Sequence, residues 1–312
     1  MNVDNTADAL VSTGLSKLGY EYVNIDDCWG EKHRDAQGNL LAKAKTFPSG
    51  IKALADHAHS KGLKLGIYAD AGSQSCSTRM QGSIGHEQQD ASTFASWGVD
   101  YLKYESCYTP EFTHRARYQI MSEALRKTGR PIFFSTAGWN DKQDYIDDGP
   151  KIANSWRTTD DNNDKFIYMV LVADQNDEFA AYAGPGRGWN DPDVLLVGDG
   201  GMTTEEYRSH FSLWALMKAP LLINSDLRNA SKDTLEILGN KEVIDVNQDS
   251  LGIQGKKVSK QGDLEVWAGP LSNKRVIVLL LNRSNSTATI TAKWEDIGLS
   301  TKAVVQARDL WA

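Results

Sequence analysis

Residues 22–29 read YVNIDDCW, and this short apolar run stops on two carboxylates with a tryptophan close by. Three similar runs follow it along the chain: residues 63–70 (LKLGIYAD), 101–107 (YLKYESC) and 188–193 (GWNDPD). Helical segments separate these runs. Acidic residues repeated at strand ends indicate one site assembled from successive β/α units of a barrel. A barrel mouth that combines acids with aromatics favours an enzyme that acts on sugars.

The alternation of strands and helices is regular over most of the chain. Seven strands are predicted, at residues 22–26, 63–69, 100–105, 131–135, 154–157, 194–197 and 220–224. Helices are predicted at residues 4–18, 49–61, 87–97, 110–128, 142–152, 166–182, 204–217 and 231–239. This order predicts a (β/α)8 barrel of the α/β class over residues 1–244. Its first strand is expected upstream of Met1, because the chain opens on a helix.

The pattern changes after about residue 245, where helices stop and turns separate alternating apolar runs. These runs are residues 264–268, 275–281, 288–292 and 303–307. They predict a C-terminal antiparallel β-sandwich domain over residues 245–312, which we expect to lack its final strands.

Composition narrows the class of partner. The 312 residues carry a formal net charge of −7 and contain no basic block, which argues against nucleic acid. No apolar stretch is long enough for a membrane helix, and the first residues lack the pattern of a signal peptide. The six histidines are scattered, and residues 160–171 lack the glycine and glutamate of a calcium loop. We therefore expect a small-molecule or oligosaccharide substrate, with no cofactor and no metal.

Two acids are candidates for glycoside hydrolysis, which needs a pair of carboxyl groups. Glu105 ends a predicted strand, and Asp161 lies just beyond another. Lys103 faces the same side as Glu105 by the two-residue period of a strand and would keep that carboxylate charged. Solvated loop acids and a structural ion pair are the alternatives that the pattern leaves open.

Other residues near the strand ends are candidates for binding a sugar. Arg157 has the forked donors that could clamp sugar hydroxyls or hold the region of Asp161. For the adjacent acids Asp26 and Asp27, hydroxyl recognition, metal binding and an exposed loop start are all open. Four tryptophans near strand ends could stack on a sugar face or belong to the core: Trp29, Trp139, Trp156 and Trp189. The three cysteines are Cys28, Cys76 and Cys107. A disulfide between Cys76 and Cys107 and three free thiols are both open on spacing alone.

Several motifs in the same order strongly resemble the plant-type α-galactosidases of glycoside hydrolase family 27. They are residues 22–29 (YVNIDDCW), 64–70 (KLGIYAD), 101–104 (YLKY), 155–157 (SWR), 188–193 (GWNDPD), 219–223 (APLLI), 246–249 (VNQD) and 264–270 (LEVWAGP). The resemblance extends over nearly the whole chain. It implies a retaining, exo-acting hydrolase that removes terminal α-linked galactose from oligosaccharides or glycoconjugates, and a secreted, extracellular or vacuolar location.

The resemblance also implies residue roles. Glu105 stands in the place of the nucleophile and Asp161 in the place of the acid/base, and Cys76 pairs with Cys107. The implied galactose-binding positions are Asp26, Asp27, Tyr68, Lys103, Trp139, Arg157 and Asp193. Cys28 would pair with a cysteine in the segment that this chain lacks.

Two departures from the family pattern bear on activity. The family nucleophile is aspartate, whereas this chain has Glu105, whose extra methylene moves the carboxylate by roughly 1–1.5 Å. Residues 137–139 read AGW where plant-type members have CEW, which leaves room for a 2-acetamido group. An α-N-acetylgalactosaminidase and a catalytically weakened galactose-binding homologue are therefore the alternative hypotheses.

Overall fold

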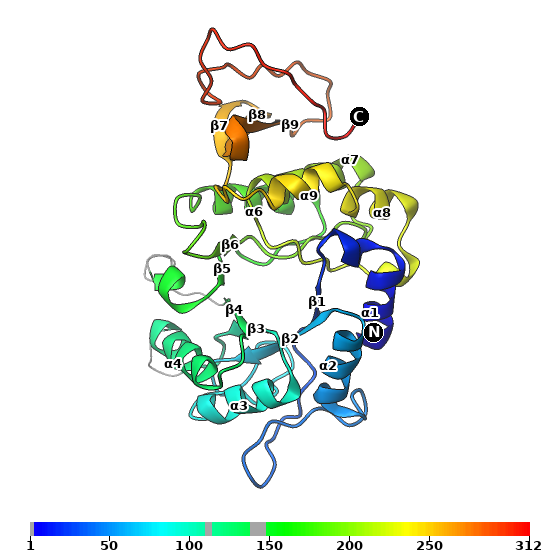
Figure 1. Cartoon of the computed structure of the whole chain (residues 1–312), viewed down its shortest axis with the longest axis vertical. Coiled ribbons are helices and arrows are strands. Elements are labelled where there is room, and N and C mark those ends of the chain that lie inside the picture. The colour runs from blue at the N-terminus through cyan, green and yellow to red at the C-terminus, as the bar shows by residue number, and fades with distance from the viewer. Residues whose placement is uncertain (1–2, 110–113, 138–147) are drawn as a thin grey trace. The chain divides into compact units, whose positions relative to one another are not determined.

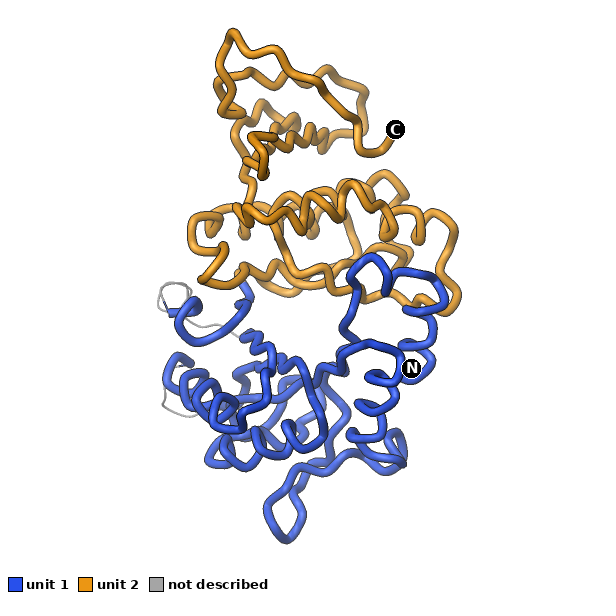
Figure 2. The backbone as a smooth tube through the Cα atoms, viewed as in Figure 1, with its two compact units in different colours: residues 1–157 blue, residues 158–312 orange. Residues whose placement is uncertain are grey.

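The structure is a computed structural model that describes residues 3–109, 114–137 and 148–312. The chain divides into two compact units, residues 1–157 and residues 158–312 (Figure 2). This division differs from the predicted boundary between a barrel over residues 1–244 and a β domain over residues 245–312. That boundary stays a prediction.

The described residues of the first unit form five parallel strands that neighbour one another in chain order. They are β1 (Tyr22–Ile25), β2 (Lys64–Asp70), β3 (Tyr101–Glu105), β4 (Phe133–Thr136) and β5 (Ser155–Arg157). Helices α2 (Gly50–Ser60), α3 (Glu87–Trp97) and α4 (His114–Lys127) follow the first three strands in turn (Figure 1). The predicted β/α alternation is confirmed for the described residues of this unit. Residues 142–147 of the helix predicted over 142–152, and residues 110–113 of the helix predicted over 110–128, lie outside the described residues.

Burial explains why the second strand is apolar almost throughout. Every residue of β2 after Lys64 is buried, as is usual for parallel strands whose two faces are both covered. Gly66 sits where a side chain would collide with its neighbours, because an added Cβ would lie 1.9 Å from the Asn24 side-chain oxygen. The rings of Tyr101 and Phe133 stack at 5.0 Å across the paired strands β3 and β4. This packing fixes the positions of the strand ends.

The N-terminal helix is shorter than predicted. Helix α1 (Val3–Ser12) ends before Gly14, whose φ of +81° is a left-handed conformation that glycine adopts without steric cost. Residues Leu15–Leu18 then form the separate 3₁₀ turn η1. The single helix predicted over residues 4–18 is therefore two elements, and the apolar pattern continues across the break because both pack inward.

The second unit begins with helix α6 (Phe166–Asp177), strand β6 (Trp189–Asp191) and helix α7 (Thr204–Leu216). Helix α7 begins with a capping box between Thr203 and Glu206. The strands predicted at residues 194–197 and 220–224 were wrong as full strands: the two segments meet in one parallel bridge, Leu195 with Ile223. Strand β6 precedes them instead, in the GWNDPD run. No helix within the described ranges is long and apolar enough to cross a membrane.

Short helices and an antiparallel sheet complete the second unit. Turn η2 (Leu227–Asn229) and helices α8 (Lys232–Leu238) and α9 (Lys241–Asn247) precede strands β7 (Lys256–Gln261), β8 (Leu264–Leu271) and β9 (Arg275–Asn282), with turn η3 (Ser272–Lys274) before β9. The three strands pair in the order β7-β8-β9. The sequence pattern missed α9 and β7.

Two further strands were expected after β9, at residues 288–292 and 303–307, and neither range contains a strand. Ile290 and Ala292 instead pack against a buried cluster formed by Val266 and Ala268 of β8 and by Ile297. The exposed fraction of Val304 is 99%. An alternating pattern of β-branched residues occurs both in strands that hydrogen-bond to a sheet and in segments whose side chains merely pack on one. The pattern alone therefore does not distinguish a strand from a packed loop.

Candidate active site

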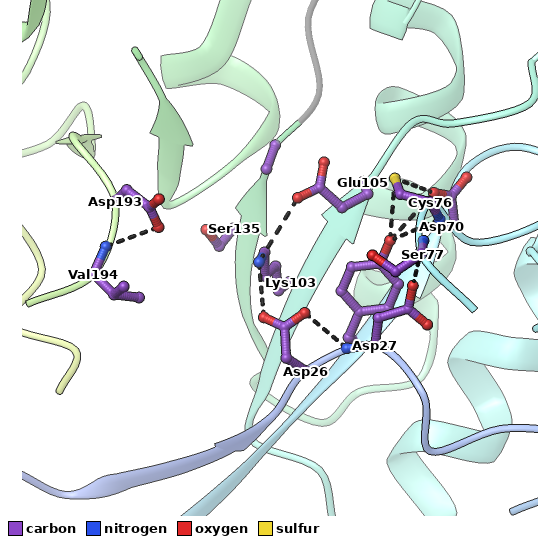
Figure 3. A network of polar contacts seen from close by, with 12 residues as sticks. Asp26, Asp27, Asp70, Cys76, Ser77, Lys103, Glu105, Ser135, Asp193 and Val194 are labelled. Atoms are coloured by element: carbon purple, nitrogen blue, oxygen red, sulfur yellow. Dashed lines mark hydrogen bonds and ion pairs between the residues drawn. The ribbon is translucent and has the colours of Figure 1, made fainter. Parts of the chain in front are cut away.

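Three acidic side chains lie at the carboxyl ends of neighbouring strands in the first unit. Asp26 directly follows β1, Asp70 ends β2, and Glu105 ends β3. Strands β2 and β3 pair so that Asp70 stands opposite Glu105. The parallel register therefore brings together three of the carboxylates that the sequence pattern singled out, as Figure 3 shows.

Lys103 lies between two of these acids. Its Nζ is 2.8 Å from Asp26 Oδ2 and 3.7 Å from Glu105 Oε1 (Figure 3). It also lies 5.7 Å from the centre of the Tyr68 ring. Burial opposes the charge on Lys103, but the carboxylates of Asp26 and Glu105 outweigh it and raise the pKa above its ordinary value. One cation thus serves two carboxylates, and the predicted ion pair with Glu105 is present.

The adjacent acids Asp26 and Asp27 differ in their exposure and in their hydrogen-bond partners. Asp26 is largely exposed, with 63% of its side-chain surface accessible, and its Oδ1 accepts a hydrogen bond from the Asp27 backbone N–H. Asp27 accepts hydrogen bonds from the Ser75 hydroxyl, the Ser77 N–H, and both the N–H and the hydroxyl of Thr78. Burial acts to raise the pKa of Asp27, but these donors prevail and lower it. Asp27 therefore anchors the loop that follows β2.

A disulfide joins that loop to the segment after β3. Cys76 and Cys107 are bonded, with their Cα atoms 5.2 Å apart, which confirms the pairing that the resemblance implied. Cys28 is a free, exposed thiol. Asp70, Cys76 and Cys107 also form the group of potential metal ligands found among the described residues, but a disulfide withdraws both sulfurs from thiolate binding.

Asp70 is fully buried beside the disulfide. Its carboxylate accepts hydrogen bonds from the Gly72 N–H at 2.7 Å and from the Cys107 N–H at 3.1 Å. The Tyr68 hydroxyl lies 3.4 Å from both Asp70 Oδ2 and Cys76 Sγ. Burial raises the pKa of Asp70 to about 7, against the lowering effect of its backbone donors. Asp70 thus fixes the backbone at Cys107, two residues after Glu105. The sequence pattern indicated that Asp70 lies at a strand end, but not that it supports the neighbouring strand end.

The second unit holds two further predicted site residues. Asp193 follows β6 with a φ of +76°, a left-handed conformation that is uncommon for a residue other than glycine. Its Oδ2 accepts a hydrogen bond at 2.8 Å from the N–H of Asn162, the residue after Asp161. Asp161 itself is exposed. The Asp193 side chain therefore holds the loop that carries the predicted acid/base.

Two more predicted residues complete the set. Arg157 ends β5 and is 95% buried, since its exposed fraction is 5%. Trp139 lies outside the described residues, as does Gly138, whereas Ala137 is buried. Sequence reasoning missed Ser75 and Thr78, which hold Asp27, and only their polarity next to Cys76 would have drawn attention to them.

Comparison with known proteins places this arrangement in a family. A family model described as alpha galactosidase A matches residues 2–249, and one described as the alpha galactosidase C-terminal beta sandwich domain matches residues 261–312. The chain belongs to the α-galactosidase family. This chain is thus a glycoside hydrolase of family 27 type, and its α/β barrel with a C-terminal β sandwich is the fold class that the sequence predicted.

Individual relatives of the α-galactosidase family agree closely in sequence and fold. The chain is 63% identical over 309 residues to alpha-galactosidase 2 of Arabidopsis thaliana, covering 99% of this chain and 78% of that protein. It is 61% identical over 311 residues to the alpha-galactosidase of Cyamopsis tetragonoloba, covering 99% and 75%. The solved structure of an alpha-galactosidase from Saccharomyces cerevisiae matches with a TM-score of 0.91 and 34% identity, covering 99% of this chain and 77% of that one.

Two relatives bear on the substrate of this α-galactosidase family member. The Saccharomyces cerevisiae enzyme has also been solved with raffinose, at 33% identity and a TM-score of 0.88, covering 99% of this chain and 77% of that one. An alpha-N-acetylgalactosaminidase of Gallus gallus is 40% identical over 318 residues, covering 98% of this chain and 78% of that protein. The plant α-galactosidases are markedly more similar to this chain, so the N-acetylgalactosaminidase hypothesis is the less supported of the two.

Proposed function

We propose that this protein is an exo-acting α-galactosidase that hydrolyses terminal α-linked galactose with retention of configuration. The observation that carries the proposal is Lys103, which lies between Asp26 and Glu105 at the strand ends of a chain that belongs to this family. A cation 3.7 Å from Glu105 favours its ionised form, which is the form that a nucleophile needs.

The reaction runs in two displacements. In the first, a Glu105 oxygen attacks the anomeric carbon, the bond to the leaving oxygen breaks, and Asp161 gives its proton to that oxygen. The products are a free alcohol and a galactosyl ester of Glu105. In the second, the Asp161 carboxylate takes a proton from water, the water oxygen attacks the anomeric carbon, and Glu105 leaves as a carboxylate. Two inversions return the sugar to the α configuration.

The remaining residues are proposed to hold the galactose. The exposed Asp26 accepts hydrogen bonds from sugar hydroxyls, and the buried guanidinium of Arg157 donates them. Tyr68 and Asp27 are proposed to shape this surface, since both contact the loop that contains Cys76. Asp193 and Trp139 are proposed as further sugar contacts on the basis of the family resemblance.

Stereochemistry tests the proposal. The protein is incubated with an aryl α-galactoside, and the anomer formed first is identified by proton NMR before mutarotation. We expect α-galactose first. If β-galactose appears first, the double displacement is wrong, and if the protein binds galactose in calorimetry without any turnover, it is a galactose-binding homologue that has lost its chemistry.

A comparison of two substrates tests the alternative that the protein is an α-N-acetylgalactosaminidase. Ala137 is buried and small at the position where the resemblance places the sugar 2-substituent, and this favours space for an acetamido group. The ratio of kcat/KM for an aryl α-galactoside to that for the matching α-N-acetylgalactosaminide decides between them. We expect the galactoside to be preferred, and preference for the acetamido sugar would overturn that choice.

We also propose that the protein is secreted or vacuolar. The Cys76–Cys107 disulfide suits an oxidising compartment. Two N-glycosylation sequons lie close together, Asn282-Arg-Ser and Asn285-Ser-Thr. Asn285 is exposed, whereas the Asn282 side chain bonds Ser284 and Ser286 in a local turn. Native protein from extracellular or vacuolar fractions should carry a glycan on Asn285 and no free thiol at Cys76. Recovery from cytosol with that thiol free would contradict the proposal.

A further inference from the structure

Asp193 is held in a strained backbone conformation by a set of specific contacts. A φ of +76° at a residue with a Cβ costs free energy and persists where surrounding contacts enforce it. The Asp193 N–H donates to Asp191 Oδ1 at 2.9 Å, and its own Oδ1 accepts from the Val194 N–H at 2.8 Å. Figure 3 shows the second of these contacts. Both come from immediate neighbours in the chain, which move with Asp193 and so do not fix the turn in space.

One contact that comes from another element is made by Trp214 on α7. The Trp214 indole Nε1–H donates to the Asp193 carbonyl at 2.7 Å, and the Trp214 side chain is fully buried. A buried indole has few rotamers open to it, so its N–H is a rigid donor aimed at the strained peptide. Trp214 therefore ties the turn that contains Asp193 to the helix.

His210, one turn earlier on α7, contacts both Trp214 and the segment that follows Asp193. Its ring packs edge-on against Trp214 with centroids 4.0 Å apart. Its Nε2 accepts a hydrogen bond at 3.0 Å from the N–H of Leu196, three residues after Asp193. Burial lowers the pKa of His210 to about 3, so the ring is neutral and its Nε2 stays an acceptor. The helix thus holds the turn at two points, Asp193 and Leu196.

We propose that Trp214 is a positioning residue for the reaction: through its hydrogen bond to the Asp193 carbonyl it sets the direction of the Asp193 carboxylate and, through Asn162, the loop that carries Asp161. This inference rests on the proposed function of Asp193 and Asp161. The path is continuous within one unit, because Asp193 Oδ2 accepts the Asn162 N–H. Trp214 acts only through these groups and does not itself touch the sugar.

The test replaces Trp214 with phenylalanine, which keeps an aromatic ring and deletes the N–H. The matched control is Trp267→Phe, because Trp267 is also fully buried and its indole N–H also bonds one acceptor, Glu265 Oε2 at 2.9 Å. Kinetics with an aryl α-galactoside, inhibition by free galactose, and urea unfolding are measured for the parent and both variants. Asp193→Ala and the double variant Asp193→Ala/Trp214→Phe complete a double-mutant cycle.

We expect Trp214→Phe to weaken galactose inhibition and lower kcat/KM about tenfold, with stability close to that of Trp267→Phe. In the Asp193→Ala background the same change should have little further effect on kcat/KM. The inference is overturned if Trp214→Phe matches Trp267→Phe in galactose inhibition, or if its effect is unchanged in the Asp193→Ala background. A parent protein that neither hydrolyses nor binds galactosides overturns the proposed function, and this inference with it.

Discussion

Shortening Glu105 to aspartate tests the assignment of the nucleophile most directly. The position of residue 105 is fixed, because β3 pairs in register with β2 and the following backbone is held by Asp70. Glu105→Asp therefore withdraws the carboxylate by roughly 1–1.5 Å without moving the main chain. Only 15% of the Glu105 side chain is exposed, so little water is available to compensate for a misplaced charge.

Two effects of this substitution oppose each other. Lys103 Nζ lies 3.7 Å from Glu105 Oε1, and a withdrawal to roughly 5 Å weakens their attraction by about 1 kcal/mol at an effective dielectric constant of 20, or severalfold in rate. Against this, a misplacement of about 1 Å at a reacting group can cost about a hundredfold in rate. The resemblance assigns the family's nucleophile to aspartate, so the shorter side chain corrects the larger error. We expect kcat to rise roughly tenfold, with KM little changed.

The assay is steady-state hydrolysis of an aryl α-galactoside, with Glu105→Gln as the matched control. The amide keeps the length and shape of the parent side chain but is no nucleophile, so we expect no turnover from it. If Glu105→Asp is slower than the parent, the site is adapted to glutamate, and the reasoning about the extra methylene is wrong. If Glu105→Gln keeps full activity, Glu105 is not the nucleophile.

Three further predictions concern charges near the site and in the core. Lys103→Met should lower kcat/KM by about 100-fold, because Asp26 and Glu105 then lose their shared cation. The control Lys64→Met, which removes a surface ion pair with Glu21, should change kcat/KM less than threefold, and equal losses of kcat/KM in the two variants would contradict the proposed role of Lys103. The parent should lose up to about 4 kcal/mol of unfolding free energy as the pH rises from about 4 to 7, because the folded pKa of Asp70, about 7, lies above its unfolded value, and Asp70→Asn should remove this pH dependence. Urea unfolding across this pH range measures the slope, with Asp56→Asn as the exposed control, and an unchanged slope in Asp70→Asn would refute the prediction. Between about pH 7 and 4.5 the parent should lose about 2–3 kcal/mol of unfolding free energy, because the folded pKa of His210, about 3, lies below its unfolded value and only the unfolded state binds the proton; His210→Gln should not show this loss. Urea unfolding measures it with His33→Gln as the exposed control, and equal acid sensitivity of the two variants would contradict the prediction.

The β/α order could be predicted from sequence because its signals are local. Residues 87–97 form a helix over the predicted range, bounded by Gly98 with a φ of +81°. The run at residues 63–69 was recognised because a parallel strand is apolar on both faces. The predicted strands at residues 288–292 and 303–307 failed because pairing depends on a partner strand, which no local pattern specifies. The same holds for helix α6, which ends at Asp177 whereas its apolar pattern continues to Tyr182.

In the candidate site, too, the sequence predicted features that depend on local motifs and missed those that depend on residues far away in the chain. The strand-end carboxylates Asp26 and Glu105 were predicted, because the register of parallel strands turns a repeated motif into a cluster. What the motif could not reveal is how many partners each acid already has. Asp27 accepts hydrogen bonds from five donors, counting the Cys28 N–H, whereas Asp26 bonds Lys103 and one backbone N–H among the residues that the structure describes.

This difference in partners supports the proposal that Asp26 faces a sugar while Asp27 shapes the surface around it. A carboxylate that already accepts several hydrogen bonds from the protein has little capacity left for a sugar, whereas an exposed carboxylate paired with one cation retains it. Asp26 is of the second kind, with Lys103 Nζ at 2.8 Å from its carboxylate. Asp27 and Asp70 are of the first kind and hold the two ends of the disulfide-linked segments. The extra methylene of Glu105 therefore acts on a carboxylate that is only 15% exposed and whose neighbouring cation lies closer to Asp26, at 2.8 Å, than to Glu105, at 3.7 Å.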